Sequence, residues 1–184
     1  MMKLAKKNNV NVSKLRPQNL SNDNSNIFNV VEYETTNLEK LNNITYDFVI
    51  LLQPTTPFRT QKIIDEAIVH FVKNYKKTDS LITITDVDYP INWSLKKKGK
   101  YVENLIKNGN QITRRQRAEK YFKPNGMVYI IKRAILKNLR NKILPTDKTL
   151  FFYVEKNVSI NIDTKIDYLL AKTIYDEKNK NTHD

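Results

Sequence analysis

The chain has 184 residues, of which 40% are hydrophobic and 28% are charged, and this composition fits one globular domain and excludes disordered and fibrous classes. It contains no cysteine, which excludes disulfide scaffolds, cysteine-ligated zinc and thiol catalysis. Its only two histidines, His70 and His183, leave little room for a histidine metal site. No apolar run approaches the roughly 18 to 20 residues of a membrane-spanning helix, so we expect a cytoplasmic protein without a membrane partner.

The net charge of +13 would suit binding to nucleic acid or to an anionic membrane surface. However, the basic residues are 25 lysines and only 7 arginines, although base readout and two-pronged phosphate contacts favour arginine. Lysine, asparagine and isoleucine are all frequent here, and they share AT-rich codons. We therefore expect no nucleic-acid partner, and we interpret the charge as solvated surface around sites for small anions.

Strands and helices alternate in the first part of the chain. Residues 4–8 resemble the last turn of a helix, 10–15 a short strand and 18–26 a loop. Loose apolar spacing predicts a helix from 27 to 41, and the continuous apolar run at 47–52 predicts a strand buried on both faces.

The same alternation continues to the end. From Thr60 the apolar period becomes 3.6, which predicts the clearest helix in the chain, up to about Tyr75. The later predicted strands are 80–85, 127–131 and 150–154, with a β-hairpin formed by 93–96 and 101–104. The later predicted helices run from residue 132 to about Arg140 and from Lys165 to about Tyr175, before a frayed polar tail.

Strands separated by helices predict an α/β fold with a mostly parallel sheet, in one domain over residues 1–178 with a polar tail at 179–184. Ligands of such sheets bind at the carboxyl ends of the strands. Polar segments follow the predicted strands at 53–59, 85–86 and 161–163. The sequence therefore predicts that these segments meet at one edge of the sheet.

Two polar segments have both a structural and a functional interpretation. The two-proline turn Gln53–Arg59 either caps the next helix or presents its Gln53 amide and its Arg59 guanidinium to a ligand with hydroxyl and acidic groups. The basic cluster Thr113–Arg117 is either solvated charge or an anion-binding loop in which Arg115 binds a carboxylate.

A third segment has the same two interpretations. Thr164 and Asp167 form a capping-box pattern, which by itself would explain a helix start. Alternatively, Asp163 follows a strand and holds a divalent cation against phosphate oxygens.

Taken together and in this order, the motifs resemble the acylneuraminate cytidylyltransferases (CMP-sialic acid synthetases). The most specific stretch reads Leu-Leu-Gln-Pro-Thr-Thr-Pro-Phe-Arg at 51–59, and the resemblance runs from about residue 3 to about residue 175. The matching segments are Leu15–Asp23, Leu51–Arg59, Arg115–Gln116, Pro124–Tyr129 and Ser159–Thr164.

The resemblance implies a Rossmann-like nucleotidyltransferase fold, and an enzyme that transfers CMP from CTP to an acidic sugar with release of pyrophosphate. The sugar would be of the sialic, legionaminic, pseudaminic or deoxy-octulosonic type, for surface glycan biosynthesis, and Mg²⁺ would be the cofactor. The segment at 86–123 would protrude and form a homodimer. The implied site residues are Arg16 and Asp23 for the nucleotide, Gln53, Arg59, Arg115, Gln116, Asn125, Gly126 and Tyr129 for the sugar acid, and Asp163 with Asn161 for the metal.

The chain also departs from the family pattern. The family's first strand and phosphate loop are missing, so the resemblance implies an N-terminally shortened chain. Asn161 stands where the family usually has the first Asp of an Asp-x-Asp pair, and an amide is a weaker ligand for Mg²⁺ than a carboxylate. Lys123 stands where arginine is common. Two functions therefore remain open: a cytidylyltransferase, or a catalytically inactive relative that binds the sugar acid or pairs with a full-length homologue.

Overall fold

The computed structural model describes residues 2–10, 15–22, 25–139, 144 and 146–180, and most of the strand predicted at 10–15 lies outside them. The chain divides into two compact units. Unit 1 comprises Met1–Asp47 and Arg133–Ile143, and unit 2 comprises Phe48–Lys132 and Leu144–Asp184. Among the described residues, no helix combines the length and the hydropathy that are needed to cross a bilayer.

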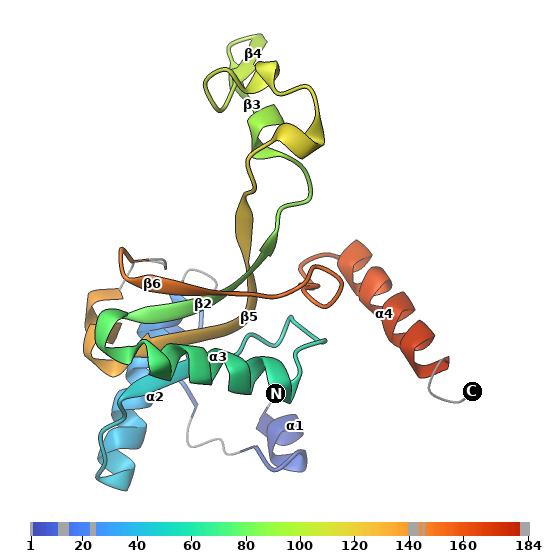
Figure 1. Ribbon diagram of the computed structural model, residues 1–184. Helices are drawn as coiled ribbons and strands as arrows, with labels where there is room; N and C mark the ends of the chain where they lie inside the picture. Colours follow the sequence, from blue (N-terminus) through green and yellow to red (C-terminus); the bar gives the residue numbers. More distant parts are fainter. Residues whose placement is uncertain (1, 11–14, 23–24, 140–143, 145, 181–184) are drawn as a thin grey trace. The chain divides into compact units, whose positions relative to one another are not determined.

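Unit 1 contains the short helix α1 (Met2–Lys7) and the longer helix α2 (Ile27–Asn42) (Figure 1). Asn26 begins α2, because its side chain accepts a hydrogen bond from the Phe28 amide at 2.8 Å. The helix predicted at 27–41 is thus confirmed.

The later part of unit 1 begins with a 3-10 helix, Arg133–Leu139, where the sequence predicts a helix. Its buried residues Leu136 and Leu139 are three positions apart, the spacing that a 3-10 helix places on one side. Arg133 donates from Nε and Nη2 to the two carboxylate oxygens of Glu39 on α2, at 2.8 Å each. These hydrogen bonds hold the pKa of Glu39 below its usual value. The two-pronged pair thereby ties the 3-10 helix to α2.

Unit 2 is built on a four-stranded sheet with the order β1-β5-β2-β6 (Figure 1). The strands are β1 (Phe48–Leu51), β2 (Ser80–Asp86), β5 (Phe122–Lys132) and β6 (Thr149–Tyr153). β2 and β6 are parallel neighbours, and β5 runs antiparallel between β1 and β2. Three of the four strands share one direction, which confirms the predicted α/β class, but the sheet is mixed because β5 separates β1 from β2.

Burial differs between the strands of this sheet. β2 is buried along all but its last residue, whereas β1 is only half-buried. The prediction that the run at 47–52 is buried on both faces is therefore wrong. Within the described residues β1 pairs with β5 alone and forms an edge of the sheet, so a continuous apolar run here marks an edge strand.

The helix α3 (Gln61–Lys73) packs on the sheet, as its 3.6-residue apolar period predicts. Thr60 begins it by accepting a hydrogen bond from the Ile63 amide at 3.3 Å. Ala67 and Phe71 are fully buried, in a core that they share with Leu81, Met127, Val128 and Ile130. This core fixes the end of β1 and the start of α3, and with them the turn that connects the two.

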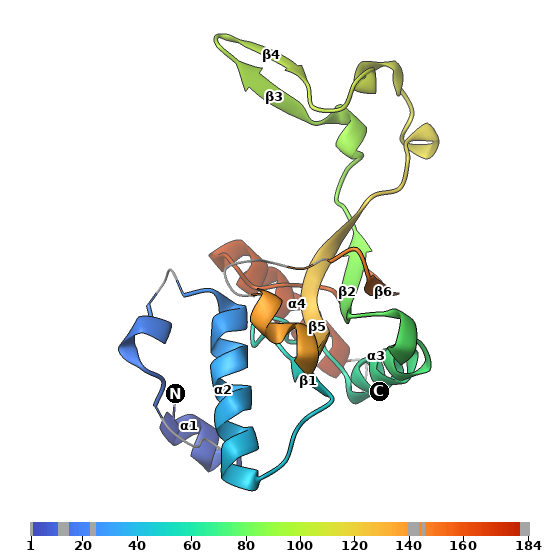
Figure 2. The same cartoon turned by 90° about the vertical axis from the view of Figure 1, so that its left-hand side faces the viewer.

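The predicted β-hairpin is present as β3 (Leu95–Lys98) and β4 (Tyr101–Asn104). Figures 1 and 2 show it at the far end of the segment that leaves the four-stranded sheet after β2 and returns to it at β5. Gly99 makes the turn with a φ of +62°, which favours glycine. The pairing role of 86–123 remains a prediction.

The helix α4 (Lys165–Lys180) is the last described element and confirms the predicted helix. It continues beyond Tyr175 to Lys180, so the predicted fraying is wrong for this stretch. Glu177 and Lys178 are good helix formers, which accounts for the extra turn. The segment at 159–163 is not part of a described strand and leads into α4 as an irregular connection.

Candidate functional site

The two-proline turn after β1 is fastened by Arg59. Its Nη1 donates to the Gln53 carbonyl at 2.9 Å and to the Thr56 hydroxyl at 2.6 Å. The same nitrogen donates to the Met127 carbonyl on β5 at 3.1 Å, across 68 residues of sequence. Burial lowers the pKa of Arg59, because its charge is partly removed from water. These contacts favour the structural interpretation of Arg59, which positions the turn beside β5.

Gly126 lies against the side chain of Gln53. Its φ of +75° is in the left-handed region that favours glycine. A Cβ at this position would lie 2.5 Å from Oε1 of Gln53, closer than two such atoms can approach. Gly126 therefore leaves the space that the Gln53 amide occupies, so the two predicted residues lie in contact.

Asn125 connects the same part of β5 to the segment before α4. Its Nδ2 donates to the Ser159 hydroxyl at 2.9 Å, and its Oδ1 accepts from the Met127 amide at 3.2 Å. The Ile162 amide in turn donates to the Thr55 carbonyl at 2.9 Å. The turn at 53–59, the start of β5 and the segment at 159–163 are thus joined in a closed circuit, which confirms that the predicted segments at 53–59 and 161–163 meet at one edge of the sheet.

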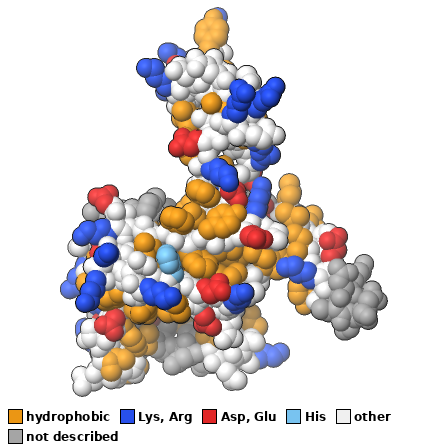
Figure 3. Space-filling model, viewed as in Figure 1, with side chains coloured by type: hydrophobic (Ala, Val, Ile, Leu, Met, Phe, Trp, Pro, Cys, Tyr) orange, Lys and Arg blue, Asp and Glu red, His pale blue; other side chains and the backbone are white. Residues whose placement is uncertain are grey.

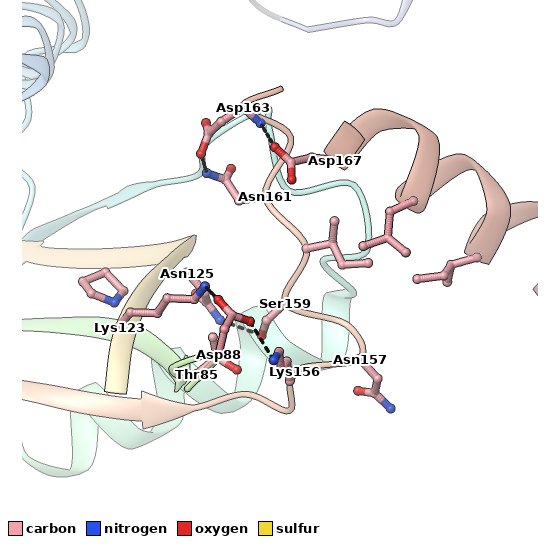
Figure 4. Close-up of a pocket in the computed structure, with 14 residues that line it drawn as sticks. Thr85, Asp88, Lys123, Asn125, Lys156, Asn157, Ser159, Asn161, Asp163 and Asp167 are labelled. Atoms are coloured by element: carbon pink, nitrogen blue, oxygen red, sulfur yellow. Dashed lines mark hydrogen bonds and ion pairs between the residues drawn. The ribbon is translucent and has the colours of Figure 1, made fainter. Parts of the chain in front are cut away.

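A cavity of about 710 Å³ opens beside this circuit (Figure 4). Leu170 and Ile174 of α4 line it on one side. Figure 4 shows two polar groups at opposite ends of it. The cavity's polar lining residues include Thr85, Asp88, Lys123, Asn125, Lys156, Asn161, Asp163 and Asp167.

The first polar group is a cationic cluster around Asp88. Its carboxylate accepts hydrogen bonds from the ammonium groups of Lys123, at 2.7 Å, and Lys156, at 2.6 Å. Hydrogen bonds from Lys123 and then Lys156 lower the pKa of Asp88 to about 2. Arg115 adds a third cation, because its Nη2 donates to the Asp88 carbonyl at 2.8 Å. Three positive charges therefore surround one negative charge.

The second polar group lies where α4 begins. Thr164 and Asp167 form the predicted capping box: the Asp167 carboxylate accepts from the Thr164 amide at 2.7 Å, and the Asp167 amide donates to the Thr164 hydroxyl at 3.3 Å. The hydroxyl and amide of Thr164 hold the pKa of Asp167 below its usual value. Asp167 is therefore occupied with starting the helix, while Asp163 remains exposed beside it.

The predicted metal pair, Asn161 and Asp163, lies before α4. Nδ2 of Asn161 donates to the Asp163 carboxylate at 2.6 Å. Oδ1 of Asn161 is buried and has no hydrogen-bond partner in the part of the chain that the structure describes. An amide oxygen and a carboxylate oxygen are ligands that Mg²⁺ accepts, usually together with substrate phosphates. The pair fits such a site, although no cluster of three or more acidic or histidine side chains occurs among the described residues.

The remaining predicted residues lie outside this cavity. Arg115 and Gln116 are exposed in a 3-10 turn, and Arg115 lines a second cavity of about 390 Å³. Tyr129 is half-buried on β5, and burial raises the pKa of its hydroxyl. Arg16 is exposed in unit 1, and Asp23 lies outside the described residues.

Sequence reasoning missed Asp88 and Lys156. Asp88 lies two residues beyond β2, so a search of the strand's carboxyl end could have included it. Lys156 carries no such signal, because its pairing with Asp88 depends on β6 lying beside β2.

On the face shown in Figure 3, the basic side chains of the described residues do not form one stripe. In the view of Figure 3 they are scattered over the visible face and mixed with acidic and hydrophobic side chains. The cluster around Asp88 is therefore a local concentration of charge at a cavity.

Comparison with known proteins identifies relatives, although no family model matches the chain. It is 28% identical over 164 residues to the CMP-N,N'-diacetyllegionaminic acid synthase of Legionella pneumophila, covering 87% of this chain and 67% of the relative. It is 28% identical over 141 residues to the post-translational flagellin modification protein B of Campylobacter coli, covering 76% of this chain and 57% of the relative. The chain thus spans roughly three fifths to two thirds of the length of these relatives.

A solved structure supports the fold. The 4-diphosphocytidyl-2C-methyl-D-erythritol synthase of Anaerococcus prevotii matches 95% of this chain and 75% of its own, with a TM-score of 0.52 and 13% identity. This likeness agrees with the predicted nucleotidyltransferase fold. The ordered motifs, their meeting at one edge of the sheet and the sequence relatives support a relationship to cytidylyltransferases, and the solved structure supports the fold.

Proposed function

We propose that this chain carries the substrate site of a cytidylyltransferase that joins CMP, taken from CTP, to an acidic sugar and releases pyrophosphate. The observation that carries the proposal is the cavity of about 710 Å³ at the meeting point of the motifs, with cations at one end and the pair Asn161 and Asp163 at the other. Such a cavity suits two reactants that are both anionic, because each needs compensating charge before they can approach.

In the proposed reaction the anomeric hydroxyl of the sugar attacks the α-phosphate of CTP, and pyrophosphate leaves. The chain contributes mainly by positioning and by electrostatic stabilisation, as in other phosphoryl-type transfers. Lys123 and Lys156 would hold an acidic group of a substrate in the large cavity, and Arg115, which lines the second cavity, would be a carboxylate partner there. Asn161 and Asp163 would hold Mg²⁺, which neutralises phosphate charge when bound.

The sugar would be oriented by residues of the two-proline turn and of β5. The Gln53 amide, held beside Gly126, can both donate to and accept from hydroxyl groups. Tyr129 and Gln116 would add further hydrogen bonds, while Arg59 and Asn125 would position the segments that carry these groups. Arg16 and Asp23 would contact the nucleotide.

The proposal includes the class of sugar and the assembly. Legionaminic acid is the first candidate, since it is named in the Legionella pneumophila relative, followed by sialic, pseudaminic and deoxy-octulosonic acids. A homodimer would form through the segment at 86–123, where Tyr101, Val102 and Leu105 are exposed. A role in surface glycan biosynthesis would follow from these sugars.

The test is a pyrophosphate-release assay with CTP, Mg²⁺ and this panel of sugar acids, and the CMP-sugar is identified by mass spectrometry. Matched reactions replace CTP with ATP, GTP or UTP and replace the acid with a neutral sugar. We expect release with CTP and one acid only. Folded protein that gives no product with any acid would contradict the proposed activity of this chain.

One observation favours a second function, a sugar-acid-binding module without turnover. Position 161 holds an amide that is hydrogen-bonded to Asp163, so the metal pair has one negative charge where two carboxylates would give two. This module would bind a sugar acid in calorimetry, or pair with a full-length homologue, without forming product. Any CMP-sugar formed by the purified chain excludes it.

A further inference from the structure

Asp88 and its two partners, Lys123 and Lys156, line the large cavity. The two lysines could bind an anionic ligand there in place of the Asp88 carboxylate. Lys123 and Lys156 are about half exposed, as is Asp88 itself, and both ammonium groups lie within 2.7 Å of its carboxylate oxygens. Ion pairs that remain in contact with water contribute little to stability, because water and salt compete for both partners. The Asp88 carboxylate can therefore be exchanged for another anion at small cost.

Three neighbouring elements of unit 2 bring this cluster together. Lys123 is on β5 directly opposite Thr85 of β2, Asp88 follows the end of β2, and Lys156 follows the end of β6. Lys156 lines both the large and the small cavity. Both lysines can thus contact a ligand in the large cavity, and Lys156 can also contact one in the small cavity.

A second observation at the same place indicates a missing partner. Thr85 is 1% exposed and lines the large cavity, and its hydroxyl has no hydrogen-bond partner among the described residues. Buried hydroxyl groups are normally paired, by protein, water or ligand. The hydroxyl lies beside Lys123 in the sheet register and adds a donor to the two ammonium groups.

We propose that Lys123 and Lys156 form an anion subsite and that Asp88 is its built-in counter-ion, which the carboxylate or phosphate group of a substrate displaces. The inference deepens the proposed function, on which the identity of the substrate rests. Since hydrogen bonds from both lysines lower the pKa of Asp88 to about 2, this carboxylate stays charged at ordinary pH and competes with the ligand throughout.

The hairpin supplies a matched control. Glu103 accepts from Lys96 at 3.1 Å and from Lys98 at 2.9 Å, so it forms the same lysine–carboxylate–lysine arrangement on an exposed strand pair. Asp88→Asn and Glu103→Gln each remove one negative charge and release two lysines. Only the first change lies at the cavity.

The experiment is isothermal titration of the full chain, wild type and variants, with three probes: N-acetylneuraminic acid, its uncharged methyl ester and inorganic pyrophosphate. We expect Asp88→Asn to increase the affinity for an anionic probe about two- to fivefold, because it releases the lysines from an exposed ion pair. Glu103→Gln should leave this affinity unchanged. Lys156→Gln and Lys123→Gln should lower the affinity for the same probe. The affinity for the methyl ester should change in none of the variants.

The probe that responds identifies the source of the anion: N-acetylneuraminic acid points to a sugar carboxylate, and pyrophosphate points to the nucleotide. The proposal is overturned if Asp88→Asn binds neither anion, or binds both with unchanged or lower affinity. It is also overturned if Glu103→Gln changes the affinity equally. Pyrophosphate-release assays on the same samples separate the two ideas, because a chain without turnover can still show the Asp88 effect, and an active chain can lack it.

Discussion

Gly126→Ala tests whether the Gln53 amide must occupy the space that Gly126 leaves. The new Cβ would lie 2.5 Å from Oε1 of Gln53 and 3.5 Å from Cγ2 of Thr56. The second distance is an ordinary contact, but the first is not, so the Gln53 amide has to move. The backbone resists as well, because φ is +75° at this position.

The expected size of the effect follows from the backbone angle and the contact. A left-handed conformation costs a non-glycine residue about 1–2 kcal/mol. For a chain of this size we expect Tm to fall by about 2–8 °C. Displacement of the amide should also weaken sugar-acid binding, because Gln53 loses the position that the space beside Gly126 gives it. Gly99→Ala is the control, since its φ is +62° and a Cβ there would meet nothing within 4 Å.

The assays are thermal unfolding followed by circular dichroism, together with calorimetric titration of the sugar acid that supports turnover. We expect Gly126→Ala to lower Tm and sugar affinity, and Gly99→Ala to strain its own turn without changing the affinity. Wild-type Tm and affinity in Gly126→Ala would refute the reasoning, and so would an equal loss of affinity in Gly99→Ala.

The other predictions concern the motif circuit, the metal pair and unit 1. Arg59→Met should destabilise the chain by about 2–3 kcal/mol in denaturant titrations, because it leaves the Met127 carbonyl without its charged donor, and a milder loss is expected for Arg59→Lys. Asn161→Asp should tighten Mg²⁺ binding in titrations with CTP present, and unchanged affinity would mean that position 161 does not face the metal. The Glu39 pKa lies below 4.5 in the folded chain, so the stability from its pair with Arg133 is present above pH 4.5 and lost as the pH falls through the folded pKa. Below pH 4.5, Tm should therefore fall more steeply in wild type than in Glu39→Gln, and parallel curves would contradict this.

Much of unit 2 could be predicted because its signals are local. The 3.6-residue period of α3, the apolar run of β1 and the capping box of α4 each depend on side chains within a few positions of one another. The meeting of the motif segments could also be predicted, since parallel strands end at the same edge of a sheet. The hydrogen bond between Ile162 and Thr55 bears this out.

The site's charge pattern could not be predicted in the same way. Asp88 contacts Lys123 and Lys156 at sequence separations of 35 and 68 residues, and these contacts exist only because β2 lies between β5 and β6. Arg59 was equally ambiguous, because the sequence does not say whether a guanidinium faces a ligand or a carbonyl of a distant strand.

By itself the sequence determined the order of the elements, the family motifs and the segments from which a site had to be built. Only the tertiary structure decided that β5 separates β1 from β2, that β1 is an edge strand and that three cations converge on Asp88. The physical reason is that periodicity and capping are interactions between near neighbours in the chain. Strand order and charge clusters arise from contacts between distant segments, which no local pattern specifies.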